Sequence, residues 1–278
     1  MAWRLRVVHD TTYNYESEVR ASFNELRMTP LSDEHQILIQ HRTSISPTAP
    51  LFSYEDYWGT TVHSFDLQTP HTTLSVTVEN LVDTSAAAEV ATAFAATWAD
   101  LSNLMLTDSV CEYLPLTALV DAVEHGIDIR SYTTPLDAVL ALSEALREHI
   151  TYTPGATHVH TSASVAWAQK KGVCQDFTNI MLSILRSAGI PARYVSGYLY
   201  SGSGEIGETI VGESHSWVEA WLGSWLPIDP TNGRGVGEQH IAVAKGRDYH
   251  DVSPMSGVFT GGRSREVCAT VSLTRLPR

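Results

Sequence analysis

A cysteine, a histidine and an aspartate, each in a distinctive local setting, constrain this chain more than any other feature. Cys174 opens a predicted helix, His215 begins a predicted strand, and Asp229 ends the strand that follows. Only a thiolate is a good nucleophile, and a neighbouring imidazolium and a helix N-terminus both favour the anion. An aspartate that accepts a hydrogen bond from the far imidazole nitrogen fixes the ring tautomer. The order and settings of these residues predict a Cys-His-Asp nucleophilic triad.

The region around the cysteine predicts helices. Residues 134–150 begin with a threonine cap and a proline in the first turn, and they carry apolar residues at helical spacing. A shorter helix is expected over residues 163–170, with Gly172 as its stop. A buried, mostly apolar helix then starts at or near Cys174 and ends at Gly189.

The next stretch predicts an antiparallel hairpin. Residues 215–222 alternate strongly, and a Gly-Ser turn leads into a partner strand over residues 225–229. Antiparallel neighbours sit roughly 5 Å apart, and the 14-residue separation of His215 and Asp229 (229 − 215) fits that hairpin. Two further strands are expected at residues 240–244 and 267–273. Helices followed by an antiparallel sheet predict an α+β domain over residues 131–278.

The N-terminal 83 residues predict strands only. Leu5, Val7 and His9 alternate with Arg4, Arg6 and Val8. Residues 37–43 and 73–78 are short, β-branched runs between Ser, Pro and Thr clusters. Gly59 supplies the backbone freedom for a turn. We interpret residues 1–83 as an antiparallel β-sandwich domain.

Residues 84–130 are richer in Ala, Leu and Val and form a predicted helical connector packed on the core. Residues 86–96 contain helix formers, and residues 116–125 repeat apolar side chains at helical spacing before Gly126. The chain is therefore expected to comprise a β domain, a helical connector and a larger α+β domain.

Composition excludes several classes of protein. The net charge of −13, from 18 basic and 31 acidic residues, argues against a nucleic-acid surface. The first ten residues are charged where a signal peptide needs an apolar run, and no stretch approaches the roughly 20 apolar residues of a membrane span. Three cysteines are too few for a disulfide framework. Unlike Cys174, neither Cys111 nor Cys268 has a candidate histidine and aspartate to act with it. We therefore expect a cytoplasmic protein with no membrane or nucleic-acid partner.

Several stretches closely resemble the transglutaminase-like superfamily core. They are Gly172 to Asp176 (GVCQD), Ala192 to Tyr198 (ARYVSGY), His215 to Trp221 (HSWVEAW) and Asp229 to Thr231 (DPT). Residues 13–15, 26–30 and 246–254 resemble bacterial members that carry an extra N-terminal β domain. The resemblance covers most of the chain. It implies a papain-like core in which Cys174 is the nucleophile, His215 the general base and acid, and Asp229 the orienting carboxylate.

The resemblance also implies a thioester formed from an amide, but it leaves the acceptor open. Some members of the superfamily cross-link glutamine to lysine, some are peptidases, and some cleave amides of glycans or small molecules. The favoured hypothesis is a peptidase or amidase, because Gln175 stands where animal cross-linking enzymes have a tryptophan. A transamidase is the alternative. A catalytically silent binding or scaffold module is a third hypothesis, disfavoured by the intact triad.

The site also needs donors for a developing oxyanion. The backbone N–H of Cys174 is the expected first donor, since a helix N-terminus leaves such groups free. Gln175, Trp167 and Tyr152 are candidates for the second. Asp176 is expected to shape the start of the helix, where an acidic residue suits the dipole.

Trp217 and His160 are candidates for lining a substrate cleft. His158 and His160 alternate and, together with His149, His215, His240 and His250, raise the question of a metal. Their spacing matches no zinc motif, so we expect neither a metal nor another cofactor. The expected partner is a peptide or amide substrate, and no sequence feature points to an oligomeric state.

Overall fold

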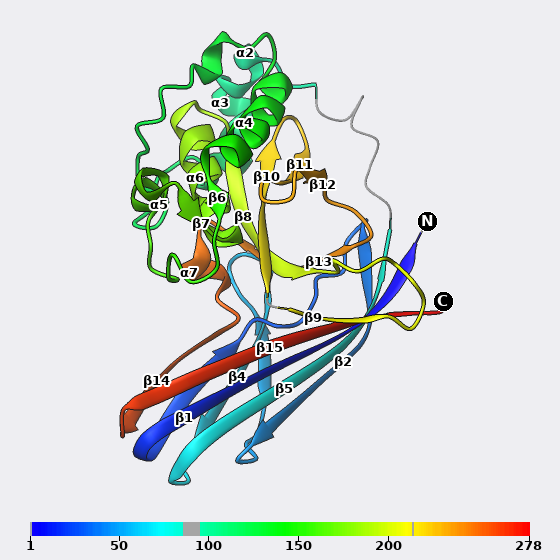
Figure 1. Ribbon diagram of the computed structural model, residues 1–278, viewed down its shortest axis with the longest axis vertical. Coiled ribbons are helices and arrows are strands. Elements are labelled where there is room, and N and C mark those ends of the chain that lie inside the picture. The colour runs from blue at the N-terminus through cyan, green and yellow to red at the C-terminus, as the bar shows by residue number, and fades with distance from the viewer. Residues whose placement is uncertain (1, 86–94, 213) are drawn as a thin grey trace.

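The computed structural model describes residues 2–85, 95–212 and 214–278, apart from the side chains of residues 104, 234 and 264. A long, twisted sheet lies beneath a compact part that contains the helices, and the two chain ends meet at one end of that sheet (Figure 1). No helix among the described residues is long and apolar enough to cross a membrane.

The lower part is one antiparallel sheet built around a very long first strand. Its strands are β1 (Trp3–Leu26), β2 (Gln36–Ser46), β3 (Phe52–Glu55), β4 (Thr61–Leu67), β5 (His71–Thr84), β9 (Thr209–Gly212), β14 (Met255–Gly261) and β15 (Ser264–Leu276). The order is β2-β5-β1-β15-β9, while β4 and β14 pair with the second half of β1, and β3 pairs with β4. A small core that includes Val19, Phe65 and Leu74 fills the far half of this sheet.

The upper part packs helices on a second sheet. Its helices are α2 (Trp98–Leu101), α3 (Leu104–Thr107), η1 (Asp108–Tyr113), η2 (Ile129–Ser131), α4 (Pro135–His149), α5 (Ala163–Gln169), α6 (Cys174–Ser187) and α7 (Tyr249–Val252). The sheet has the order β12 (Arg234–Gly235), β11 (Trp225–Asp229), β10 (His215–Trp221), β8 (Ala192–Leu199) and β13 (His240–Gly246). The short strands β6 (Thr151–Tyr152) and β7 (Lys171–Gly172) pair in parallel.

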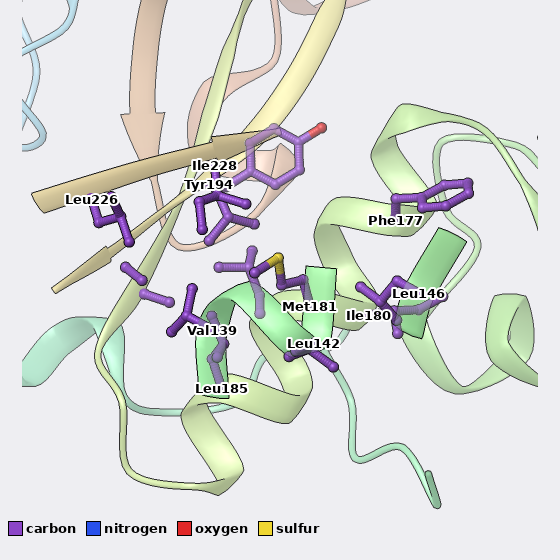
Figure 2. Packing of buried hydrophobic residues seen from close by; sticks show 14 of the residues in the cluster. Val139, Leu142, Leu146, Phe177, Ile180, Met181, Leu185, Tyr194, Leu226 and Ile228 are labelled. Atoms are coloured by element: carbon purple, nitrogen blue, oxygen red, sulfur yellow. The ribbon is translucent and has the colours of Figure 1, made fainter. Parts of the chain in front are cut away.

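Helix α6 is the buried centre of the upper part. Ile180 and Met181 are fully buried and pack between α4 and the strands β8 and β11 (Figure 2). Side chains such as Leu142 and Leu146 of α4 cover one flank, and Tyr194 of β8 covers another. Because removing a buried Leu, Ile or Met side chain costs about 2–5 kcal/mol, this packing fixes α6, and with it the residue at its N-terminus.

The expected fold class is confirmed, because the fold is α+β with an N-terminal antiparallel sheet domain. The hydrogen bonds join the strands of that domain into one continuous sheet that includes β14 and β15. The strand expected at residues 267–273 was assigned to the α+β domain of residues 131–278, and β14 was not expected as a strand, but both β14 and β15 pair with β1. A strand of 24 residues has edges long enough to accept partners from both ends of the chain.

The helix expected over residues 116–125 is wrong, since this stretch contains no helix. Neighbouring helices engage its polar groups instead: the backbone carbonyls of Leu119 and Asp121 accept from the Ala163 N–H and the Ser183 hydroxyl, and the Asp121 carboxylate accepts from the Ser164 N–H. A segment satisfied in this way has no need of its own helical ladder. Most of the helix expected over residues 86–96 lies outside the described residues.

Gln36 fastens the lower sheet to the upper one. Its amide Nε2 donates to the carbonyls of Leu31 (2.6 Å) and Ala242 (2.7 Å), and its Oε1 accepts from the Ala242 N–H (2.8 Å). Ala242 lies on β13, an edge strand of the upper sheet, beside a bulge in its pairing with β8. The buried side chain of Gln36 thus closes an otherwise open sheet edge.

We expect Gln36→Leu to lower the free energy of unfolding by about 1–3 kcal/mol, because it leaves the buried N–H of Ala242 without a partner, while the Ala242 carbonyl still accepts from the Leu31 N–H. Urea unfolding followed by circular dichroism measures the change. Gln40→Leu is the matched control: Gln40 is an exposed position on the same strand, and its change is expected within about 0.5 kcal/mol. Equal effects at the two positions would contradict the role assigned to Gln36.

Candidate active site

Cys174 is the first residue of α6, as the sequence predicted. Val173 precedes it in an extended conformation and donates its N–H to the Asp176 carboxylate (2.7 Å), which also accepts from the Thr157 hydroxyl (2.6 Å). Burial raises the pKa of Asp176 and outweighs these hydrogen bonds. The Cys174 side chain therefore faces the positive end of the helix dipole, while Asp176 ties the helix start to the preceding loop.

Gly172 serves a purpose other than the expected helix stop. Helix α5 ends earlier, at Gln169, and is capped by Lys170, which adopts a left-handed conformation with φ of 54°. A Cβ atom at residue 172 would lie 2.6 Å from the Asp176 side chain, closer than any real contact of this kind. The missing side chain lets Asp176 reach back to Val173.

The hairpin brings His215 and Asp229 together. Nε2 of His215 lies 2.8 Å from Oδ2 of Asp229, and the two side chains are 9% and 0% exposed. Because Nε2 is engaged, Nδ1 is the nitrogen left for Cys174, with which the ring also forms a hydrogen bond. Burial lowers the pKa of His215, but the hydrogen bonds with Asp229 and Cys174 prevail and raise it to about 9. The ring is therefore an imidazolium at neutral pH.

Asp229 is surrounded by further donors. The backbone N–H groups of Thr231 and Asn232 donate to Oδ1, at 3.0 and 3.2 Å, and the Asn232 side chain donates to Oδ2 at 2.8 Å. Burial raises the pKa of Asp229, but the hydrogen bonds from His215, His240 and Asn232 hold it well below its usual range. The carboxylate thus stays charged beside the imidazolium.

Sequence reasoning missed His240 as a member of this site. Its Nδ1 accepts from the Gly237 N–H (3.3 Å), so Nε2 carries the proton that is donated to Asp229 (3.3 Å). Burial lowers the pKa of His240 and keeps this ring neutral. In the sequence, His240 stands at the start of a predicted strand, and that position does not show that its ring contacts Asp229.

His215, Asp229 and His240 are also close enough to share a metal ion, with their ligand atoms within 4.8 Å of one another. In the described part of the chain no other His, Cys, Asp or Glu group meets that criterion. Oδ2 of Asp229 already accepts from both rings, so hydrogen bonding accounts for the cluster. Ordinary zinc ligation would break both of those bonds.

A cleft of about 460 Å³ opens beside Cys174, between the upper and lower parts of the molecule. The upper part contributes Cys174 and His215, and the lower sheet contributes Ile210 and Gly212 of β9 and Leu273 of β15. The rest of the lining is Tyr152, Pro154, Gly155, Thr157, Val173, Leu199, Ser201 and Ser214. Apart from His215 and the reacting thiol of Cys174, every described lining residue is apolar or a neutral polar side chain.

The other predicted site residues are scattered around this cleft. Tyr152 lines it and is half-exposed, whereas Gln175 donates its amide to the Val159 carbonyl (2.8 Å) and Trp167 stacks on His149, with ring centroids 3.7 Å apart. The first oxyanion donor, the N–H of Cys174, is at the helix start as expected.

Neither residue proposed for the cleft wall lines the cleft. Trp217 is 1% exposed and packs with Val195 and Ala242 in a separate small cluster. Trp217 alternates with Ser216 and Val218 on a strand buried on both faces, so sequence alternation alone did not say which face meets the cleft. The ring of His160 lies near that of His250, with centroids 6.4 Å apart.

Comparison with known proteins gives matches over most of the chain. Residues 5–83 match the bacterial transglutaminase-like N-terminal region, and residues 124–230 match the transglutaminase-like superfamily. An uncharacterized protein of Mycobacterium leprae is 42% identical over 281 residues, covering 99% of both chains. One from Mycobacterium tuberculosis is 31% identical over 275 residues, covering 92% of this chain and 87% of its own.

Two further similarities are narrower or more distant. A protein-glutamine gamma-glutamyltransferase of Pseudomonas aeruginosa is 32% identical over 110 residues, which are 37% of this chain and 16% of that one. The crystal structure of a candidate cysteine protease from Cytophaga hutchinsonii superimposes with a TM-score of 0.79 at 20% identity, covering 100% of this chain and 92% of that one. At this identity the superposition shows a shared fold.

We expect ¹H–¹⁵N NMR to give His215 a pKa of about 9 in the wild type and a lower one in Cys174→Ala, which removes one of the two partners that offset burial. His240 is the internal control and stays neutral in both proteins. A raised histidine pKa stabilises the fold fully below about pH 6.5, and this contribution is lost as pH rises through about 9. An unchanged His215 titration in Cys174→Ala would contradict the assigned contact.

Proposed function

The chain belongs to the transglutaminase-like superfamily, and from this premise we propose that it is a cysteine-dependent acyl-transfer enzyme acting on amide bonds. One observation carries the proposal: Nε2 of His215 lies 2.8 Å from the buried Asp229 carboxylate, in a cleft that His215 shares with Cys174, the first residue of α6. Nucleophile, base and orienting group are thus in mutual reach, which is the geometric requirement for nucleophilic catalysis.

In the first half-reaction, the Cys174 thiolate attacks the carbonyl carbon of the amide. The carbonyl oxygen becomes an oxyanion beside the backbone N–H of Cys174. As the C–N bond breaks, Nδ1 of His215 donates its proton to the departing amine, and a thioester remains on Cys174. Asp229 holds the ring in the orientation that this proton transfer needs.

In the second half-reaction, a water molecule attacks the thioester. His215, now neutral, accepts a proton from the water through Nδ1, and the C–S bond breaks to give a carboxylic acid. The proton restores the imidazolium beside the thiolate, so the cycle closes without a cofactor. The reaction is the hydrolysis of an amide, as in a peptidase or amidase.

Two features favour hydrolysis and a cytoplasmic location. Gln175 follows the nucleophile and binds the Val159 carbonyl, so the position held by a tryptophan in animal cross-linking enzymes is used here for loop packing. Cys111, Cys174 and Cys268 are all free, which suits a reducing compartment.

Transamidation is the second candidate, favoured by the local similarity to a protein-glutamine gamma-glutamyltransferase. The thioester would then be attacked by an amine instead of water. Incubation with a glutamine-containing peptide library and a fluorescent primary amine separates the two outcomes. Hydrolysis gives a new carboxylate without amine incorporation, and transamidation gives the fluorescent conjugate.

We expect iodoacetamide to alkylate Cys174 rapidly well below pH 8.5, and His215→Ala to slow this reaction at pH 7 by about tenfold or more, because the imidazolium that stabilises the thiolate is gone. Peptide mass spectrometry measures the rate at each cysteine. The exposed Cys111 and Cys268 in the same digest are the internal controls, and their rates should be unaffected by the substitution.

A different result would overturn the proposal. If Cys174 reacts no faster than the two control thiols in the wild type, and His215→Ala changes nothing, the three residues do not act as a unit. The catalytically silent scaffold would then become the better description of the protein.

A further inference from the structure

Strand β9 is an edge of the lower sheet that borders the cleft beside Cys174. It pairs with β15 on one side, and no strand of the described residues pairs with its other side. Ile210 and Gly212 of this strand both line the cleft. We propose that the acyl donor is an extended, uncharged peptide segment that pairs with the free edge of β9 and so passes Cys174. This inference rests on the proposed function and specifies its substrate class.

The hydrogen-bond pattern identifies which groups of β9 face outward. On β15, Arg275 donates its N–H to the Glu208 carbonyl (3.1 Å) and accepts from the Gly207 N–H (2.7 Å), so its backbone points toward the β9 side. Backbone direction alternates along a strand, so Leu273 and Val271 point the same way. Their partners Ile210 and Gly212 are therefore bonded to β15, and Val211 between them directs its N–H and C=O away from it.

The side chains of β9 alternate between the two faces of the sheet. Residues two apart share a face of the sheet, and Ile210 and Gly212 share the face toward the cleft. Val211 points to the opposite face, where it is 73% exposed. A Cβ atom at Gly212 would meet no atom within 4 Å, so space remains open there. A peptide added to this edge would direct alternate side chains into the cleft.

The chemistry of the cleft selects the kind of segment. Among its described lining residues, His215 and the Cys174 thiolate of the proposed mechanism are charged but already face each other, and the others are apolar or neutral polar side chains such as Leu199 and Ser201. A charged side chain would lose its hydration there without gaining an ionic partner. Pairing with Val211 gives affinity through main-chain hydrogen bonds, as in other cases of strand addition to a sheet edge.

The test compares three electrophiles on Cys174: N-acetyl tetrapeptide chloromethyl ketones with randomised uncharged residues, their single-residue counterpart, and iodoacetamide. Second-order alkylation rates are measured by peptide mass spectrometry.

Val211→Pro removes the outward N–H but leaves the pairing with β15 intact, because a proline is tolerated where the N–H faces away from the sheet. We expect it to lower the tetrapeptide rate by about three- to tenfold, the effect of one hydrogen bond. Val211→Ala retains the N–H and should keep the wild-type advantage of the tetrapeptide over the single residue.

A second pair of variants guards against a folding defect. Gly212→Phe places a large side chain in the cleft and should lower the tetrapeptide rate more than Val211→Pro does. Gly235→Phe is the matched control, because residue 235 also has open space around it but lies outside the cleft. Circular dichroism checks that all variants are folded.

The outcomes separate this inference from the proposed function. Equal tetrapeptide rates in wild type, Val211→Pro and Gly212→Phe, with rapid iodoacetamide alkylation, would refute the edge-strand inference and leave the cysteine chemistry standing. A wild-type tetrapeptide rate no higher than the single-residue rate would also refute it. Slow iodoacetamide alkylation of wild-type Cys174 would overturn both.

Discussion

The candidate site depends on one buried anion. The Asp229 side chain has no exposure to solvent, and a carboxylate in such a place is very costly unless hydrogen bonds replace its hydration. Five donors do so here: both rings, the Asn232 amide and the N–H groups of Thr231 and Asn232. Since these groups come from β10, from the start of β13 and from the turn after β11, the carboxylate determines how three parts of the chain meet.

The same carboxylate determines the charge on each histidine. His215 is surrounded by two groups that favour a positive ring and has a raised pKa, whereas His240 shares Asp229 with that positive ring and has a lowered one. Two imidazoles within reach of one carboxylate thus take different protonation states, because only one of them also faces a thiol. The neutral ring fixes the position of the carboxylate, and the charged ring faces Cys174.

The lower sheet is part of the site as well as an additional domain. Gln36 fastens it to β13, and β9 leaves the upper part between β8 and β10 to join β15 before the chain returns at His215. The strand that begins with the histidine therefore emerges directly from the lower sheet. Any shift between the two parts would change the width of the cleft and the position of His215 together.

The sequence predicted the features that depend on local chemistry. The helix start at Cys174, the hairpin that joins His215 to Asp229 and the α+β class all followed from caps, alternation and spacing. The helix over residues 116–125 failed because contacts from α5 and α6, which no local window contains, replaced its own hydrogen bonds. The contact of His240 with Asp229 was equally hidden, since β13 lies three places from β11 in the sheet. Strand β9 was missed because its four residues carry no periodic signal.

The pairing of β1 with β15 has a consequence for biosynthesis. The first strand leaves the ribosome early, but its neighbour in the sheet begins only at residue 264, and Leu273 of that neighbour lines the cleft. The residues of helix α6 and of the upper sheet are synthesised while one wall of the cleft, and the part of their core that Val271 and Leu273 provide, is still missing. Contacts so distant in sequence also form slowly. Cys174 is therefore synthesised before the strand that completes its cleft, and translation itself separates the two in time.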